Sequence, residues 1–202
     1  KESRYRRTGE FLDVIKRSWS GEIYDYEGEF FQLDQGGLRR GLGDREIPQV
    51  YFGGASPPGL EVASSHADVY LTWGEPLDAV AEKVRVIKEM AAGKDRSIRA
   101  GLRIHIITRD TEEEAWVEAD RIIAGLDPAE VEKARERFSR MESVGQAKMA
   151  ELAHGGDDDL VIAPNLWAGI GLVREGAGTA IVGSHEQVAE RLLEYRDVGI
   201  DE

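Results

Sequence analysis

The sequence contains no cysteine. Disulfides, thiolate metal ligands and thiol nucleophiles are therefore excluded together, and stability has to come from packing. No apolar run approaches the roughly 20 residues that cross a bilayer. The first residues (KESRYRRTGEF) also lack the apolar core of a signal peptide. These absences predict a cytoplasmic protein without a membrane-spanning segment.

Positive charge is scarce as well. Lys and Arg number 26 against 39 Asp and Glu, which gives a net charge of −13. The summed field repels phosphate backbones and anionic lipids, so neither nucleic acid nor a membrane surface is an expected partner. A small anionic substrate would need local cations, and Arg103 and Arg174 are the obvious suppliers.

What is present is the pattern of an α/β protein. With 202 residues, 41% of them hydrophobic, the chain can bury one sizeable core, and we expect a single domain over 1–202. Short connections between alternating strands and helices predict parallel strands joined by right-handed crossovers. Helical spacing or capping boxes predict helices over 10–19, 57–65, 77–91, from 111 onward and over 184–198. Strands are expected at 49–52, 67–73 and 97–110, with a hairpin at 24–33.

A long insertion interrupts this rhythm from about 126 to 183. A helix is expected to begin at Pro128, but from Pro164 to Ala180 glycine is too frequent for a stable helix. Loops of this length are uncommon unless they are functional or disordered, and we interpret the segment as a lid. Arg174 is the only cation in the glycine-rich part. It is either a solvated loop residue or a group that reaches an anionic substrate when the lid closes.

Arg103 and His105 are the first candidates for a working site. They alternate with Leu102, Ile104 and Ile106, so a strand would place the cation and the imidazole on one face and the aliphatic side chains on the other. A polar face on an otherwise apolar strand is costly unless it meets water, a partner or a ligand. An ion-paired Arg and a structural His are the alternative, but their pairing on one face favours function.

Two further segments end expected strands. Gly53, Gly54, Ala55 and Ser56 offer backbone amides and a hydroxyl to a phosphate just before a helix, although by themselves they are better explained as a tight turn between strand and helix. Trp73 either walls a substrate pocket or plugs the core. The remaining histidines show no metal-ligand spacing, so no metal site is expected; they are His66, His154 and His185.

With these residues assembled, the chain resembles the bacterial-luciferase-like flavin monooxygenases, and within them the FMNH2-dependent alkanesulfonate monooxygenases. The resembling segments occur in the same order across nearly the whole chain. They are VYFGGAS (50–56), DVYLTWGEP (68–76), GLRIHIITRDTEEEAW (101–116) and PNLWAGIGLVREGAGTAIVGS (164–184). The last of them is long and specific.

The resemblance implies a (β/α)8 TIM barrel with a long insertion before the last helix. Such a barrel typically needs about 250 residues, and the first strands and the last strand are missing from this sequence. An incomplete barrel would leave open sheet edges. We therefore expect the chain to be part of a longer protein.

The resemblance also implies a chemistry. Reduced FMN, supplied by a separate NAD(P)H-dependent FMN reductase, would activate O2, and cleavage of the C–S bond of an alkanesulfonate would release sulfite and an aldehyde. Matching by motif, Arg103 and His105 correspond to active-site residues, Arg174 to a lid residue that also lines the substrate pocket beside Trp73, and Gly53 to Ser56 to the flavin phosphate region. A homo-oligomer is expected. The alternatives are a flavin or deazaflavin enzyme with a different small substrate, organosulfur or otherwise, and a flavin-binding relative without catalysis.

Overall fold

The computed structural model describes residues 2–127, 160–173 and 176–202, and these form two compact units. The first unit comprises the residues up to Gly53 together with Pro57–Tyr70 and Ile87–Ile98. The second comprises Gly54–Ser56, Leu71–Val86 and the described residues from Arg99 onward. Within the described part of the chain, no helix is both long and apolar enough to span a bilayer.

The first unit is built from helices and a hairpin. Its elements are α1 (Glu2–Trp19), β1 (Tyr24–Glu27), β2 (Gln32–Gly36), β3 (Tyr51–Phe52), α2 (Pro57–His66) and the first residues of β4 (Val69–Trp73). The predicted hairpin is confirmed, because β1 and β2 pair antiparallel. The Glu10 carboxylate of α1 holds its loop by accepting the backbone N–H groups of Glu29, Phe30 and Phe31.

The second unit contains the remaining strands and helices of the described chain. Its elements are the rest of β4, most of α3 (Leu77–Ala92), β5 (Arg99–Arg103), β6 (His105–Arg109), α4 (Glu112–Ala124), β7 (Val161–Ala163), β8 (Leu166–Trp167), α7 (Ile170–Val173), β9 (Ala180–Ser184) and α8 (His185–Asp197). Both predicted capping boxes are confirmed, with Thr111 and Glu114 opening α4 and Ser184 and Gln187 opening α8. These reciprocal bonds satisfy amides that the first turn of a helix leaves without partners.

The strands lie in separate open sheets, of order β1-β2, β3-β4-β5 and β6-β9-β8-β7. The predicted parallel pairing holds for β3 with β4 and for β6 with β9. The predicted insertion over 126–183, for which no strand was proposed, contributes β7 and β8, and β8 runs antiparallel to both β7 and β9. The physical reason is local, since β7 and β8 are joined by a tight turn at Pro164 and Asn165, and a connection that short permits only antiparallel pairing.

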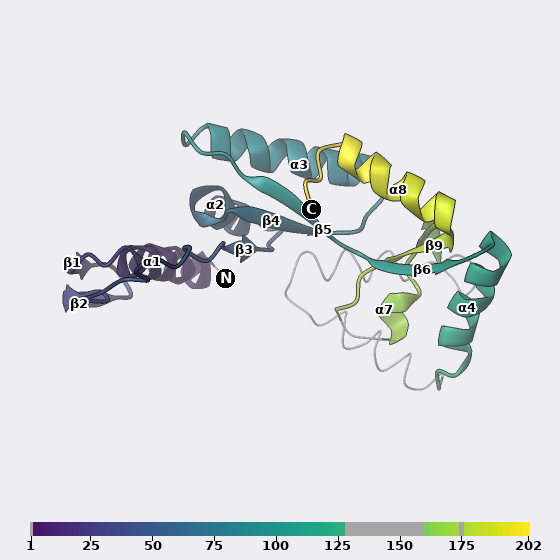
Figure 1. Cartoon of the computed structure of the whole chain (residues 1–202), viewed down its shortest axis with the longest axis horizontal. Helices are drawn as coiled ribbons and strands as arrows, with labels where there is room; N and C mark the ends of the chain where they lie inside the picture. Colours follow the sequence, from purple (N-terminus) through teal and green to yellow (C-terminus); the bar gives the residue numbers. More distant parts are fainter. Residues whose placement is uncertain (1, 128–159, 174–175) are drawn as a thin grey trace. The chain divides into compact units, whose positions relative to one another are not determined.

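The long strand predicted over 97–110 is divided at Ile104 into β5 and β6, and Figure 1 shows β6 continuing from β5. Leu102 and Ile104 pack with α3 and α8 in one cluster. Farther along, Ile107 packs with α4 and β9 in another. Ile106, expected to be buried, is 49% exposed. The chain passes from one sheet to the next here, so the buried face changes with the helix that covers it.

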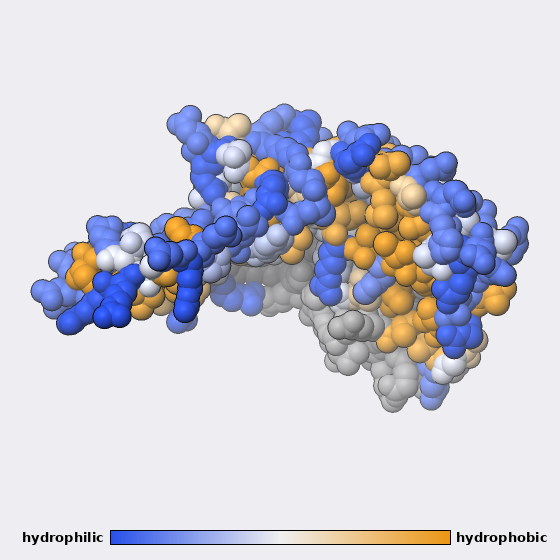
Figure 2. Space-filling view, in the orientation of Figure 1, coloured by the Kyte–Doolittle hydropathy of each residue, from blue (hydrophilic) through white to orange (hydrophobic). Residues whose placement is uncertain are grey.

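Apolar side chains also remain on the surface of the second unit. Figure 2 shows them gathered around α8, where Leu192 and Leu193 are 37% and 46% exposed. Ile106 on β6 belongs to the same class of exposed aliphatic residues.

Candidate active site

Three segments far apart in sequence meet at the turn that follows β4. The Gly74 N–H donates to the carbonyl oxygen of Arg103 at 3.1 Å, and the Gly74 carbonyl accepts from Thr179 Oγ1 at 2.6 Å. The Thr179 carbonyl in turn accepts the backbone N–H of His105 at 3.0 Å. The end of β4, the junction of β5 with β6, and the residues before β9 are thus fixed to one another by hydrogen bonds.

Two residues predicted separately are brought together here. The Arg103 guanidinium lies over the indole ring of Trp73, with its Cζ 4.6 Å from the ring centroid. A cation over the face of a tryptophan is attracted by the negative π-surface, which restricts where a long arginine side chain can point. Because Arg103 is exposed, its charge remains open to a ligand from solvent.

His105 follows Arg103 on the same run of chain and is half-buried. Its strand neighbours Leu102 and Ile104 pack into the cluster beneath α3 and α8. Alternation within β5 directs Arg103 away from that cluster, whereas within β6 His105 shares a face with Ile107, which packs with α4 and β9. Whether both act on a substrate stays a prediction.

The glycine-rich segment reaches the same place through Gly178. This residue has a φ of +77°, and a Cβ atom there would lie 2.6 Å from Cε3 of Trp73. Glycine is required twice over, by its left-handed backbone and by its close approach to the ring. The sequence showed an excess of glycine but could not show which one touches the tryptophan.

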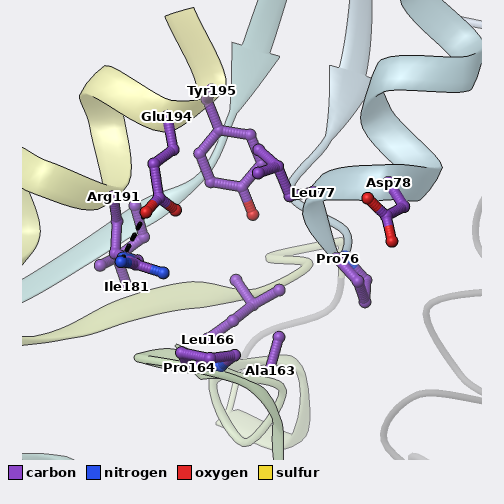
Figure 3. Close-up of a pocket in the computed structure, with 10 residues that line it drawn as sticks. All are labelled: Pro76, Leu77, Asp78, Ala163, Pro164, Leu166, Ile181, Arg191, Glu194 and Tyr195. Atoms are coloured by element: carbon purple, nitrogen blue, oxygen red, sulfur yellow. Dashed lines mark ion pairs between the residues drawn. The ribbon is translucent and has the colours of Figure 1, made fainter. Parts of the chain in front are cut away.

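Beneath the turn, Glu75 and Tyr195 anchor it to the helices. The Tyr195 hydroxyl donates to the Glu75 carbonyl at 2.7 Å, and burial raises the pKa of Tyr195 to about 12. The fully buried Glu75 carboxylate pairs with Lys83 of α3. Figure 3 shows Tyr195 beside a cavity of about 320 Å³ that Leu77, Leu166 and Ile181 also line. Because its pKa lies well above 7, the Tyr195 hydroxyl stays protonated and can donate at neutral pH.

The predicted phosphate-binding segment joins β3 to α2. Within it, the Ser56 hydroxyl oxygen is buried and has no hydrogen-bond partner among the residues that the structure describes. The segment precedes a helix of 10 residues whose free amides favour an anion. A hydroxyl without a partner can donate to a phosphate oxygen, so this segment stays a candidate for phosphate binding.

Other predicted features lie elsewhere. Arg174 and residues 128–159 of the predicted lid fall outside the described residues. No group of His, Asp or Glu suited to holding a metal occurs in the described ranges. Instead, Nδ1 of His66 lies 3.3 Å from Oδ1 of Asp13, and Nε2 of His185 lies 3.3 Å from Oδ1 of Asp110. The predictions of a single domain and of a lid stay predictions.

Sequence reasoning missed Thr179 and the Glu75–Lys83 pair. Thr179 stands in a run of glycine and alanine with no periodicity to mark it. In the sequence, Lys83 is expected on a solvent-exposed helix face, and only the fold shows that it pairs with the buried carboxylate of Glu75. No signal in a single sequence identifies either contact.

A family model described as luciferase-like monooxygenase matches residues 1–202. The chain belongs to the luciferase-like monooxygenase family. The match covers every segment from which the candidate site is built, so the α/β architecture found here is that of this family.

Solved structures of family members share the fold at low sequence identity. EDTA monooxygenase from Chelativorans sp. BNC1 is 21% identical, with a TM-score of 0.73, over 98% of this chain and 53% of that one. Riboflavin lyase, solved with modified FMN and riboflavin, is 18% identical, with a TM-score of 0.72, over 98% and 51%. The coenzyme F420-dependent tetrahydromethanopterin reductase from Methanopyrus kandleri is 20% identical, with a TM-score of 0.58, over 97% and 55%.

The chain therefore spans about half the length of these relatives. One of these enzymes was solved with modified FMN and another depends on coenzyme F420, so relatives of this chain use either cofactor. The buried Ser56 hydroxyl directly precedes α2 in the sequence and has no hydrogen-bond partner among the described residues, so it could donate to a cofactor phosphate.

Proposed function

We propose that this chain forms part of a two-component monooxygenase that uses reduced FMN and O2 to cleave the C–S bond of an alkanesulfonate. The products would be sulfite and an aldehyde. The observation that carries the proposal is the Arg103 guanidinium held over Trp73, 4.6 Å from the ring centroid. A sulfonate combines an anionic head with an apolar tail, and this pair offers a fixed cation beside an aromatic wall.

Arg103 would bind the sulfonate oxygens through charge-assisted hydrogen bonds. In a chain of net charge −13, such a local cation is what allows an anion to approach. His105 would orient the substrate or hold a proton on its imidazole ring. Arg174 would add a second cation when the glycine-rich segment closes and would exclude water.

FMN would be held at its phosphate by Gly53, Gly54, Ala55 and Ser56. The buried Ser56 hydroxyl supports this assignment. When bound in its reduced state, FMN supplies the electrons that activate O2. A separate NAD(P)H-dependent FMN reductase would deliver it, and a homo-oligomer of the full-length protein is part of the proposal.

The test is sulfite release by the full-length protein with reductase, NADH, FMN and alkanesulfonates of several chain lengths. Arg103→Ala should lower kcat/KM by about 10- to 100-fold, because a charge-assisted bond to the sulfonate is lost. Arg109→Ala is the matched control, since Arg109 is an exposed arginine of β6 that pairs with Glu118. Absence of sulfite with every sulfonate, or equal losses in the two variants, would contradict the proposal.

A second candidate is a deazaflavin oxidoreductase, which the F420-dependent relative favours. Fluorescence titration of the full-length protein with FMN and with F420 separates the two. Tight binding of F420 without FMN binding would replace the first candidate with the second. Binding of FMN without turnover of any sulfonate would indicate a flavin-binding relative that has lost catalysis.

A further inference from the structure

Thr179 occupies an unusual position between the elements of the site. Its side chain is fully buried, and it immediately precedes β9. The hydroxyl donates to the Gly74 carbonyl at 2.6 Å, while the Thr179 carbonyl accepts the N–H of His105 at 3.0 Å. One residue therefore connects the turn after β4 with the start of β6.

The contacts around Thr179 are close enough to transmit its position. A Cβ on Gly74 would lie 2.6 Å from Thr179 Oγ1 and 2.5 Å from Cδ1 of Ile104. The neighbouring Gly178 approaches the Trp73 ring just as closely. Because these contacts are already close, a shift of the Thr179 backbone would displace the turn that follows Trp73.

We propose that Thr179 is a positioning residue for the sulfonate site, a role that rests on the proposed function. Its hydroxyl sets the Trp73 ring against which Arg103 stacks, and its carbonyl sets the backbone of His105. Without the hydroxyl, the Gly74 carbonyl loses its side-chain donor in a place that water does not reach. The Trp73 ring and the guanidinium over it would then lose their fixed orientation.

The test compares Thr179→Val and Thr179→Ala, which lack the hydroxyl, with Thr179→Ser, which keeps it. Ser64→Ala is the matched control, because Ser64 is a fully buried hydroxyl of α2 that bonds Glu61 and Lys94 instead. All variants are made in the full-length protein, and folding is verified by circular dichroism. If Thr179→Val fails to fold, Thr179→Ala carries the comparison.

Two measurements are made on each variant. The first is the emission of Trp73, obtained as the difference between spectra with Trp73 and with Trp73→Phe. The second is the Kd for 1-octanesulfonate from fluorescence titration. We expect the two hydroxyl-free variants to shift the Trp73 emission and to raise Kd about tenfold, and Thr179→Ser to restore both.

The proposal is overturned if folded Thr179→Ala keeps both the Trp73 emission and the Kd of the wild type. It is also overturned if Ser64→Ala produces the same changes, because the effect would then reflect general loss of stability. If the wild type does not bind 1-octanesulfonate, the proposed function fails, while the Trp73 emission still decides whether Thr179 positions the ring.

Discussion

At the scale of single residues, the candidate site depends on close contacts between small groups. Gly178 allows the glycine-rich segment to touch Trp73, and Gly74 allows Thr179 to reach the backbone of the turn. Arg103 then finds a fixed aromatic surface. The chemistry-bearing side chains were visible in the sequence, but their orientation depends on residues that carry no chemistry of their own.

Gly178→Ala should therefore damage the site more than Gly176→Ala. Both glycines have positive φ, +77° and +72°, so each alanine variant bears a backbone cost of about 1 kcal/mol. Only at position 178 does the new methyl group meet a ring, whereas at 176 no described atom lies within 4 Å. Urea unfolding should show an extra loss of about 1–3 kcal/mol for Gly178→Ala. Equal losses would mean that the contact with Trp73 carries no energy.

At the scale of elements, α1 and α2 pack around a half-buried histidine. His66 ends α2, with its Nδ1 3.3 Å from the Asp13 carboxylate of α1. Lys16 of α1 donates to the His66 carbonyl at 2.6 Å, and Arg96 donates to the nearby carbonyl oxygens of Ser64 and Ala67. Desolvation by burial lowers the pKa of His66, although Asp13 opposes this shift. Folding thus favours the neutral imidazole.

The stability of the protein should therefore fall in mild acid. Because the folded pKa lies below the unfolded value of about 6.5, the contribution of His66 is complete above that pH and is lost as pH falls through the folded pKa. Urea unfolding between pH 8 and 5 should show a smaller loss for His66→Gln than for the wild type. His185→Gln is the control, since that side chain is 60% exposed. An unchanged pH dependence in His66→Gln would refute the assignment.

At the scale of the whole molecule, the strands form open sheets. In the described part of the chain, β6 and β7 are the outer strands of one sheet, and Ile106 on β6 is 49% exposed. An exposed aliphatic side chain on an outer strand invites pairing with another chain. Figure 2 shows that apolar surface continues around α8.

Expressed alone, the 202-residue chain should self-associate, and Ile106→Lys should reduce this association several-fold, because a lysine on an outer strand opposes edge pairing. Sedimentation velocity over a range of concentrations measures the effect. Val117→Lys is the control, because Val117 is 67% exposed but lies on α4 rather than on a strand. A monomeric wild-type chain, or an equal effect of the two lysines, would show that β6 does not mediate association.

Local physics made much of the fold predictable. The capping boxes at Thr111 and Ser184 were identified correctly, because each is decided by side chains within three residues of the helix start. The hairpin at β1 and β2 and the order of strands and helices from β3 to α4 also followed from local patterns, whereas β7, β8, α7 and β9 in the predicted insertion did not. The antiparallel course of β8 and the exposure of Ile106 were not predicted, because both depend on which distant element packs alongside.

The sequence by itself determined the elements outside the predicted insertion, the shortage of positive charge and the presence of Arg103, His105 and Trp73. Only the tertiary structure decided that Arg103 lies over Trp73 and that Thr179 joins Gly74 to His105. The physical reason is how far along the chain the residues that decide each feature lie from one another. Helix starts and strand periodicity are set by neighbours in sequence, whereas a stacked ring or a buried hydroxyl needs groups from separate strands to meet, and no local pattern encodes that meeting.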